Sequence, residues 1–170
     1  MPFIAQSLTT LYDNQEDRLC LIFNDREKRQ LMGLMTRRLL KGILAQLPDW
    51  LTQKHTDSMP RTAEQQRAVD EIHHQISQQS VPVTYGKFAK DQKPDSFLIN
   101  TINFAKAQSG NQKIRLKFLD VNKTTEIILI ITPEQLHKLM GEILKQVKSW
   151  DINNPWQEKN IAPGNEGVMH

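Results

Sequence analysis

The chain has 170 residues, of which 38% are hydrophobic and 24% are charged, and its formal net charge is +3. This length predicts one compact domain or two small ones, and the composition excludes wholesale disorder and a collagen-like repeat. No uninterrupted apolar run exceeds five residues, whereas a membrane-spanning helix needs about 20, so we expect no membrane partner. The first residues lack the features of a signal peptide, and Cys20 has no second cysteine to pair with, so we expect a cytoplasmic protein.

The first half of the chain predicts three strands followed by a helix. The strands are expected at residues 3–9, 18–23 and 30–35, with polar turn residues between the second and third. The helix is expected to begin after Thr36, to carry an apolar stripe from Leu39 to Leu47, and to end at Pro48.

A surface helix is predicted over residues 62–78. Its thin apolar face consists of Ala68, Val69, Ile72 and Ile76, and its other positions are mostly Gln, His and charged residues. The adjacent His73 and His74 project about 100° apart on such a helix, so they cannot chelate one ion together and are expected to face solvent.

The second half repeats the order of the first. Strands are expected at residues 97–103, 114–118 and 126–131, and the run Ile127–Ile131 is apolar on both faces, which is typical of a central strand covered on both sides. The closing helix has an N-cap at Thr132, with Pro133 and Glu134 at favourable positions in the first turn.

Together these elements predict an α+β fold of two similar three-strand-plus-helix units, βββα–α–βββα. Residues 1–150 are expected to form one domain with an approximate internal duplication, its halves being residues 1–54 and 95–150 linked by the helix over 62–78. The short connections favour one antiparallel sheet packed against the helices; the alternative is two small sheets that share the helices as a common core. Residues 151–170 are rich in Asn, Pro and Gly and are expected to form a flexible tail.

No pattern in the sequence predicts catalysis, a metal or a cofactor. The glycines form no phosphate-binding loop, and the histidines and the cysteine show no metal-ligand spacing. Cys20 lies inside an apolar run, which is typical of a core thiol.

Basic side chains gather in two regions. The first consists of Arg29, Arg37, Arg38 and Lys41. Two arginines in the first turn of a helix are unfavourable for its dipole unless they meet an anion or an acidic partner, or pair with carboxylates of a neighbouring strand. The second region consists of Arg115, Lys117 and Lys123, which either contact nucleic acid or protect solvated strand edges.

The tail contains one large aromatic residue, Trp156, in polar surroundings. Such a residue either anchors the tail in a groove of a partner or folds back onto its own domain.

These features favour a non-catalytic binding protein, an adaptor, inhibitor or assembly subunit that acts through a protein partner. A nucleic-acid-binding protein that uses the basic regions is the first alternative, and an enzyme of unrecognised type is the second. A homo-oligomer is compatible with either form of binding.

Overall fold

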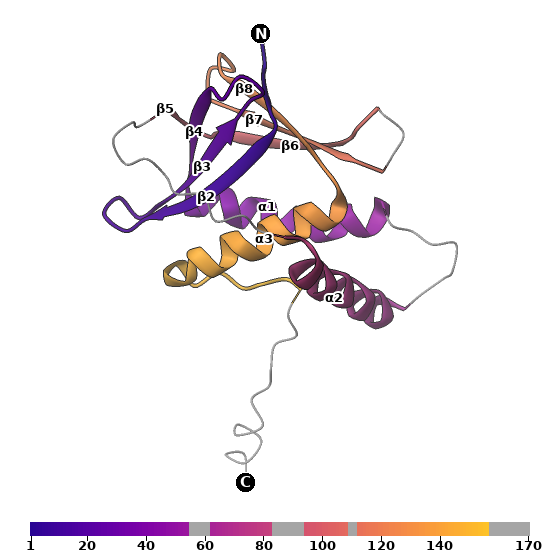
Figure 1. Ribbon diagram of the computed structural model, residues 1–170. Coiled ribbons are helices and arrows are strands. Elements are labelled where there is room, and N and C mark those ends of the chain that lie inside the picture. Colours follow the sequence, from indigo (N-terminus) through magenta and orange to yellow (C-terminus); the bar gives the residue numbers. More distant parts are fainter. Residues whose placement is uncertain (55–61, 83–93, 109–111, 157–170) are drawn as a thin grey trace.

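The computed structural model describes residues 1–54, 62–82, 94–108 and 112–156, and it contains eight strands and three α-helices in that part of the chain (Figure 1). The strands are β1 (Phe3–Ala5), β2 (Ser7–Asp13), β3 (Arg18–Asn24), β4 (Gln30–Met35), β5 (Asp95–Leu98), β6 (Thr101–Lys106), β7 (Ile114–Leu119) and β8 (Glu126–Ile131). The helices are α1 (Arg37–Lys54), α2 (Ala63–Ser80) and α3 (Pro133–Gln146), and a short 3-10 helix, η1, follows at Lys148–Trp150.

The strands form two four-stranded sheets. Sheet A has the order β1-β8-β7-β6, and sheet B has the order β2-β3-β4-β5. Within each sheet three strands are antiparallel, but β1 pairs in parallel with β8 and β5 pairs in parallel with β4. The first strand of each half of the chain therefore belongs to the sheet formed by the other half.

The α+β class is confirmed, but the prediction of a single antiparallel sheet is wrong, because the structure has two mixed sheets. The expected first strand at residues 3–9 is two strands, which meet at Gln6 where the chain passes from sheet A to sheet B. The chain makes the reverse passage between Leu98 and Thr101. A three-residue strand paired with a distant strand has no local turn signal, so the sequence pattern could not reveal it.

The core lies between the two sheets and the helices, which occupy opposite sides of the molecule in Figure 1. The inner faces of the sheets meet at Phe23 and Phe118, whose ring centroids are 4.8 Å apart. Leu47 of α1 and Leu136 of α3 are fully buried against these faces. Burial of apolar surface from both halves in one core is the main stabilising term of the fold.

Strand β8 is internal to sheet A, but it is not covered on both faces as its apolar run predicts. Ile127 and Leu129 project into the core, whereas Ile130, on the outer face, is 47% exposed. Apolar composition on both faces of a strand thus does not require burial of both faces.

The starts of two helices lie where the sequence pattern predicts them. The Thr132 hydroxyl accepts a hydrogen bond from the Gln135 amide, and the Gln135 side chain accepts one from the Thr132 amide, which confirms the predicted start of α3. Thr36 caps α1 in a similar way, because its hydroxyl accepts from the Leu39 amide. The prediction that α1 ends at Pro48 is wrong: the helix continues to Lys54, and the burial of Leu51 beyond the proline compensates for the lost hydrogen bond.

Helix α2 lies on the other helices with its polar side inward. His74 and Ser77 are buried, whereas Ile72 and Ile76 are 52% and 55% exposed. Three of the four residues of the predicted apolar face are therefore exposed, Val69 is half-buried, and the expectation that His74 faces solvent is wrong. Polar contacts replace apolar ones: Thr52 of α1 donates to Asp70, and the contacts of His74 are described below.

The two faces of β8 allow a matched test of the core. We expect Leu129→Ala to lower the free energy of unfolding by about 2–5 kcal/mol, because it removes a side chain that is 4% exposed. Ile130→Ala on the outer face should cost less than about 1 kcal/mol. Urea denaturation measures both, and equal losses would contradict the assignment of the two faces.

Candidate functional site

The first predicted basic region is divided between the two ends of β4. Arg37, Arg38 and Lys41 lie together in the first turns of α1, which follows the end of β4. Arg29 precedes the start of β4, where its guanidinium binds Asp25 at 2.6 Å and Glu27 at 3.3 Å. Six residues of extended chain span roughly 20 Å, so Arg29 does not join the other three.

The three residues on α1 form no ion pair within the described residues. Arg37 faces Asp17, whose pKa is held below its ordinary value by hydrogen bonds from Tyr12 and Trp150 and by the charge of Arg37. Arg38 and Lys41 are exposed.

The second predicted basic region is also divided. Arg115 and Lys117 project from the outer face of sheet A, because the alternate residues Leu116 and Phe118 project into the core. Lys117 binds the Glu126 carboxylate of the neighbouring strand at 2.8 Å. Lys123 lies in the turn between β7 and β8, with a φ of 57°.

Trp156 folds back onto its own domain, which is the second of the two alternatives for this residue. Its side chain is 3% exposed and belongs to the main core, so it does not project from a flexible tail. Ordered packing therefore extends six residues beyond the predicted boundary at 150, and the rest of the predicted tail, 157–170, lies outside the described residues.

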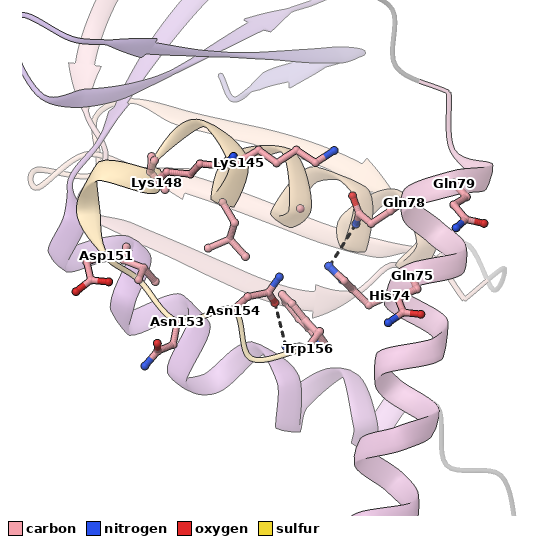
Figure 2. A pocket seen from close by; sticks show the side chains of 14 residues that line it. His74, Gln75, Gln78, Gln79, Lys145, Lys148, Asp151, Asn153, Asn154 and Trp156 are labelled. Carbon is pink, nitrogen blue, oxygen red and sulfur yellow. Dashed lines mark hydrogen bonds between the residues drawn. The ribbon is translucent and has the colours of Figure 1, made fainter. Parts of the chain in front are cut away.

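A cluster of His74, His137 and Trp156 joins α2, α3 and the C-terminal segment. The His74 and Trp156 rings are stacked, with centroids 4.6 Å apart and an angle of 8° between planes, and the His137 ring meets Trp156 edge-on at 5.2 Å. The Nδ1 atoms of the two histidines are 3.0 Å apart, so one donates a hydrogen bond to the other when both rings are neutral. Figure 2 shows the Trp156 ring beside His74 at the edge of a cavity of about 580 Å³.

Gln78 connects this cluster to the helices around it. Its side-chain amide nitrogen donates to the backbone carbonyl of His137 at 2.6 Å. Its backbone carbonyl accepts a hydrogen bond from the Lys138 ammonium at 2.7 Å. Gly141 of α3 permits this approach, because a Cβ there would lie 2.1 Å from the Gln78 side-chain oxygen. The cluster therefore fastens α2 and the C-terminal segment to α3.

Burial, and then the charge of His137, lower the pKa of His74 from 6.5 to about 4. The hydrogen bonds and ring contacts of His74 are made with His137, Gln78 and Trp156, and none of these is a carboxylate that would favour the charged ring. At neutral pH the His74 ring is therefore uncharged.

A second hollow lies between α1 and sheet A. This α1–β6 groove has a volume of about 610 Å³. Helix α1 contributes Arg38, Leu39, Gly42, Ile43 and Gln46, and the opposite wall is formed by Leu98, Ile99, Asn100, Thr101, Ile102 and Phe104. Residues 38, 42 and 46 follow one another at helical spacing, so they form one line along the groove. The corner between β5 and β6 is fixed where Ile99 packs against Gly33, a position at which a Cβ would lie 2.6 Å from the isoleucine.

Strand β6 is an edge strand of sheet A, and its free edge borders this groove. The Ala107 amide donates to the Lys113 carbonyl, so the odd-numbered residues of β6 are those that hydrogen-bond to β7. The backbone N–H and C=O groups of Ile102, Phe104 and Lys106 consequently point away from the sheet. No described residue forms a hydrogen bond with them.

The corresponding edge on the other side of the molecule borders a hollow of about 570 Å³ and has a side-chain partner at Thr10. Strand β2 is the edge of sheet B beside α3, and the Gln146 side chain donates to the Thr10 hydroxyl at 2.6 Å and to its carbonyl at 3.4 Å. In the α1–β6 groove the equivalent place is taken by Trp50, whose ring lies 5.9 Å from that of Phe104. This ring contact supplies no hydrogen bond to the backbone of β6, whereas Gln146 bonds the Thr10 carbonyl of β2.

Sequence reasoning missed both the histidine cluster and the groove. His74 and His137 are 63 positions apart, and nothing local links them. The groove had one signal, the isolated Gly42 within a strong helical pattern, since such a glycine often marks close packing or a functional surface.

A scan of protein-family models, a search of curated proteins and a search of solved structures found no match to this chain. Within the described residues, no three His, Cys, Asp or Glu side chains lie close enough together to hold a metal ion. None of the described helices has both the length and the apolar character needed to cross a membrane.

The buried indole provides a test of the C-terminal segment. We expect Trp156→Ala to cost about 3–5 kcal/mol of stability, because it removes a core side chain and exposes the His74 ring. Asn153→Ala, at an exposed position three residues earlier, should change stability by less than about 0.5 kcal/mol. Thermal and urea unfolding distinguish the two, and a neutral Trp156→Ala would contradict the packing of this segment.

The lowered pKa of His74 makes the stability of the fold depend on pH, and it determines the direction of that dependence. Between pH 6.5 and about 4 the unfolded chain binds a proton at His74 that the folded chain does not, so stability should fall as the pH falls through this window. The full effect is of the order of 3 kcal/mol. His74→Gln should flatten the profile in that window, whereas His73→Gln, on the exposed side of α2, should keep it; identical profiles for the wild type and His74→Gln would refute this assignment.

Proposed function

We propose that this protein is a non-catalytic binding protein that takes an extended segment of a partner protein as an additional strand at the edge of β6. The observation that carries the proposal is the α1–β6 groove, where a row of backbone donors and acceptors that bond to no described residue meets an apolar wall. An adaptor, an inhibitor or an assembly subunit would use such a surface in the same way.

Strand addition supplies affinity and specificity through different groups. Main-chain hydrogen bonds to Ile102, Phe104 and Lys106 would hold a partner segment of any sequence. Its alternate side chains would enter the groove between Ile102 and Phe104 on one side and Ile43 on the other. Gly42 widens the groove at its middle, because no atom lies within 4 Å of the place that a Cβ would occupy.

Nucleic-acid binding is the second candidate, and Arg115 and Lys117 favour it because they share the exposed outer face of sheet A. Two observations weigh against it. Lys117 is already paired with Glu126, and the aromatic residues of the described strands all project from the inner faces, so no ring is available there for base stacking. The aromatic strand residues are Phe3, Tyr12, Phe23, Phe97, Phe104 and Phe118.

We also infer that the two halves derive from an internal duplication. Residues 3–54 and 95–146 have the same order of elements, and Thr36 and Thr132 cap equivalent helices 96 positions apart. The duplication would create two equivalent grooves; the one between β2 and α3 has a volume of about 570 Å³, and Gln146 bonds to Thr10 at the strand edge beside it.

The groove can be tested by filling it. A displayed library of random peptides of about eight residues should yield binders to the wild-type protein. We expect Gly42→Trp to weaken binding of a selected peptide by at least about tenfold, because the indole occupies the groove. Fluorescence anisotropy with the labelled peptide measures the change.

Gly42→Ala is the matched control. It should retain binding and raise the stability of α1 by about 0.5–1 kcal/mol, because alanine is the better helix former and has room for its methyl group. Thermal unfolding of both variants confirms that they fold. Selected peptides that bind wild type and Gly42→Trp equally would overturn the proposed site.

A further inference from the structure

Among the described residues that line the α1–β6 groove, one is charged. Arg38 stands at the end of the groove where β6 begins, beside Asn100 and Thr101. It is exposed and forms no ion pair with a described residue. No acidic residue lies in the first turn of α1, so nothing on this helix neutralises it.

Two further cations adjoin Arg38 on the surface of α1. Lys41 and Arg37 lie one turn or less away, within an arc of about 100° around the helix axis. The equivalent part of α3 has the opposite character: Glu134 stands in its first turn, and Lys138 binds Glu142 at 3.2 Å. The α1–β6 groove is therefore basic at one end, while the lysine that lines the β2–α3 groove is neutralised by Glu142.

We propose that the segment taken by the α1–β6 groove is acidic, with a carboxylate bound by Arg38 at the start of β6, an inference that rests on the strand addition proposed above. A guanidinium presents parallel N–H groups that fit a carboxylate in bidentate fashion. Arginine therefore recognises a carboxylate by its geometry as well as by its charge. The segment belongs to another protein chain, and its apolar residues follow the acidic one along Ile102 and Phe104.

A protein segment fits this site better than a nucleic acid does. The free carbonyl groups of Ile102 and Phe104 need hydrogen-bond donors, which a phosphodiester backbone lacks and a peptide backbone supplies. The remaining groove walls are predominantly apolar, with Leu39 and Ile43 on the helix side. Charge complementarity at Arg38 then selects among peptides.

The experiment compares two synthetic peptides that share an alternating Thr-Val core, one beginning with Asp-Asp and the other with Lys-Lys. We expect the acidic peptide to bind the full-length protein at least about tenfold more tightly in low salt. Arg38→Glu should reverse this preference, and Arg38→Lys should keep part of it. Arg26→Glu is the matched control, because it changes the net charge equally from an exposed position in the β3–β4 turn and should leave the preference unchanged.

The outcomes separate this inference from the proposed function. If both peptides bind equally, and Gly42→Trp abolishes both while Arg38→Glu abolishes neither, strand addition stands and the acidic class is wrong. If Arg26→Glu acts as strongly as Arg38→Glu, the preference reflects the general field and the Arg38 site is wrong. If neither peptide binds and the library yields no groove binder, the proposed function itself fails.

Discussion

The two sheets depend on the exchange of a short strand between the halves of the chain. β1 completes the sheet of the second half, and β5 completes the sheet of the first. Each passage takes only one or two residues, so the sheets are held close together with their inner faces in contact at Phe23 and Phe118. Neither half can bury its inner face without the other, which makes the described core a single unit with strong coupling between the halves.

This exchange also determines which surfaces are left free. When β5 joins β4, the chain turns at Ile99 and starts β6 as the outer strand of sheet A, directly beside α1. The symmetric arrangement places β2 beside α3, but Gln146 bonds to Thr10 there. A single side chain thus bonds to the edge of β2, whereas no described residue bonds to the free edge of β6. Edge strands are usually protected against chance pairing with other chains. Binding of a partner would explain why β6 keeps an open edge beside an apolar groove.

The packing of α2 follows a different principle from that of α1 and α3. Those helices bury leucines, whereas α2 buries His74, Ser77 and part of Gln78 and exposes its isoleucines. Stacking on Trp156 and a chain of hydrogen bonds to α3 replace hydrophobic burial. Such contacts are directional, so they hold α2 in one orientation, and they require a neutral His74.

The sequence by itself determined the elements whose signals are local. Caps at Thr36 and Thr132 mark the starts of α1 and α3, and alternation in β7 shows which of its faces is buried, because these effects act within a few residues. Only the tertiary structure decided the strand exchange, the inward polar face of α2 and the return of Trp156. Each of these depends on contacts between residues far apart in the chain, where the gain from burial or pairing exceeds the local preference.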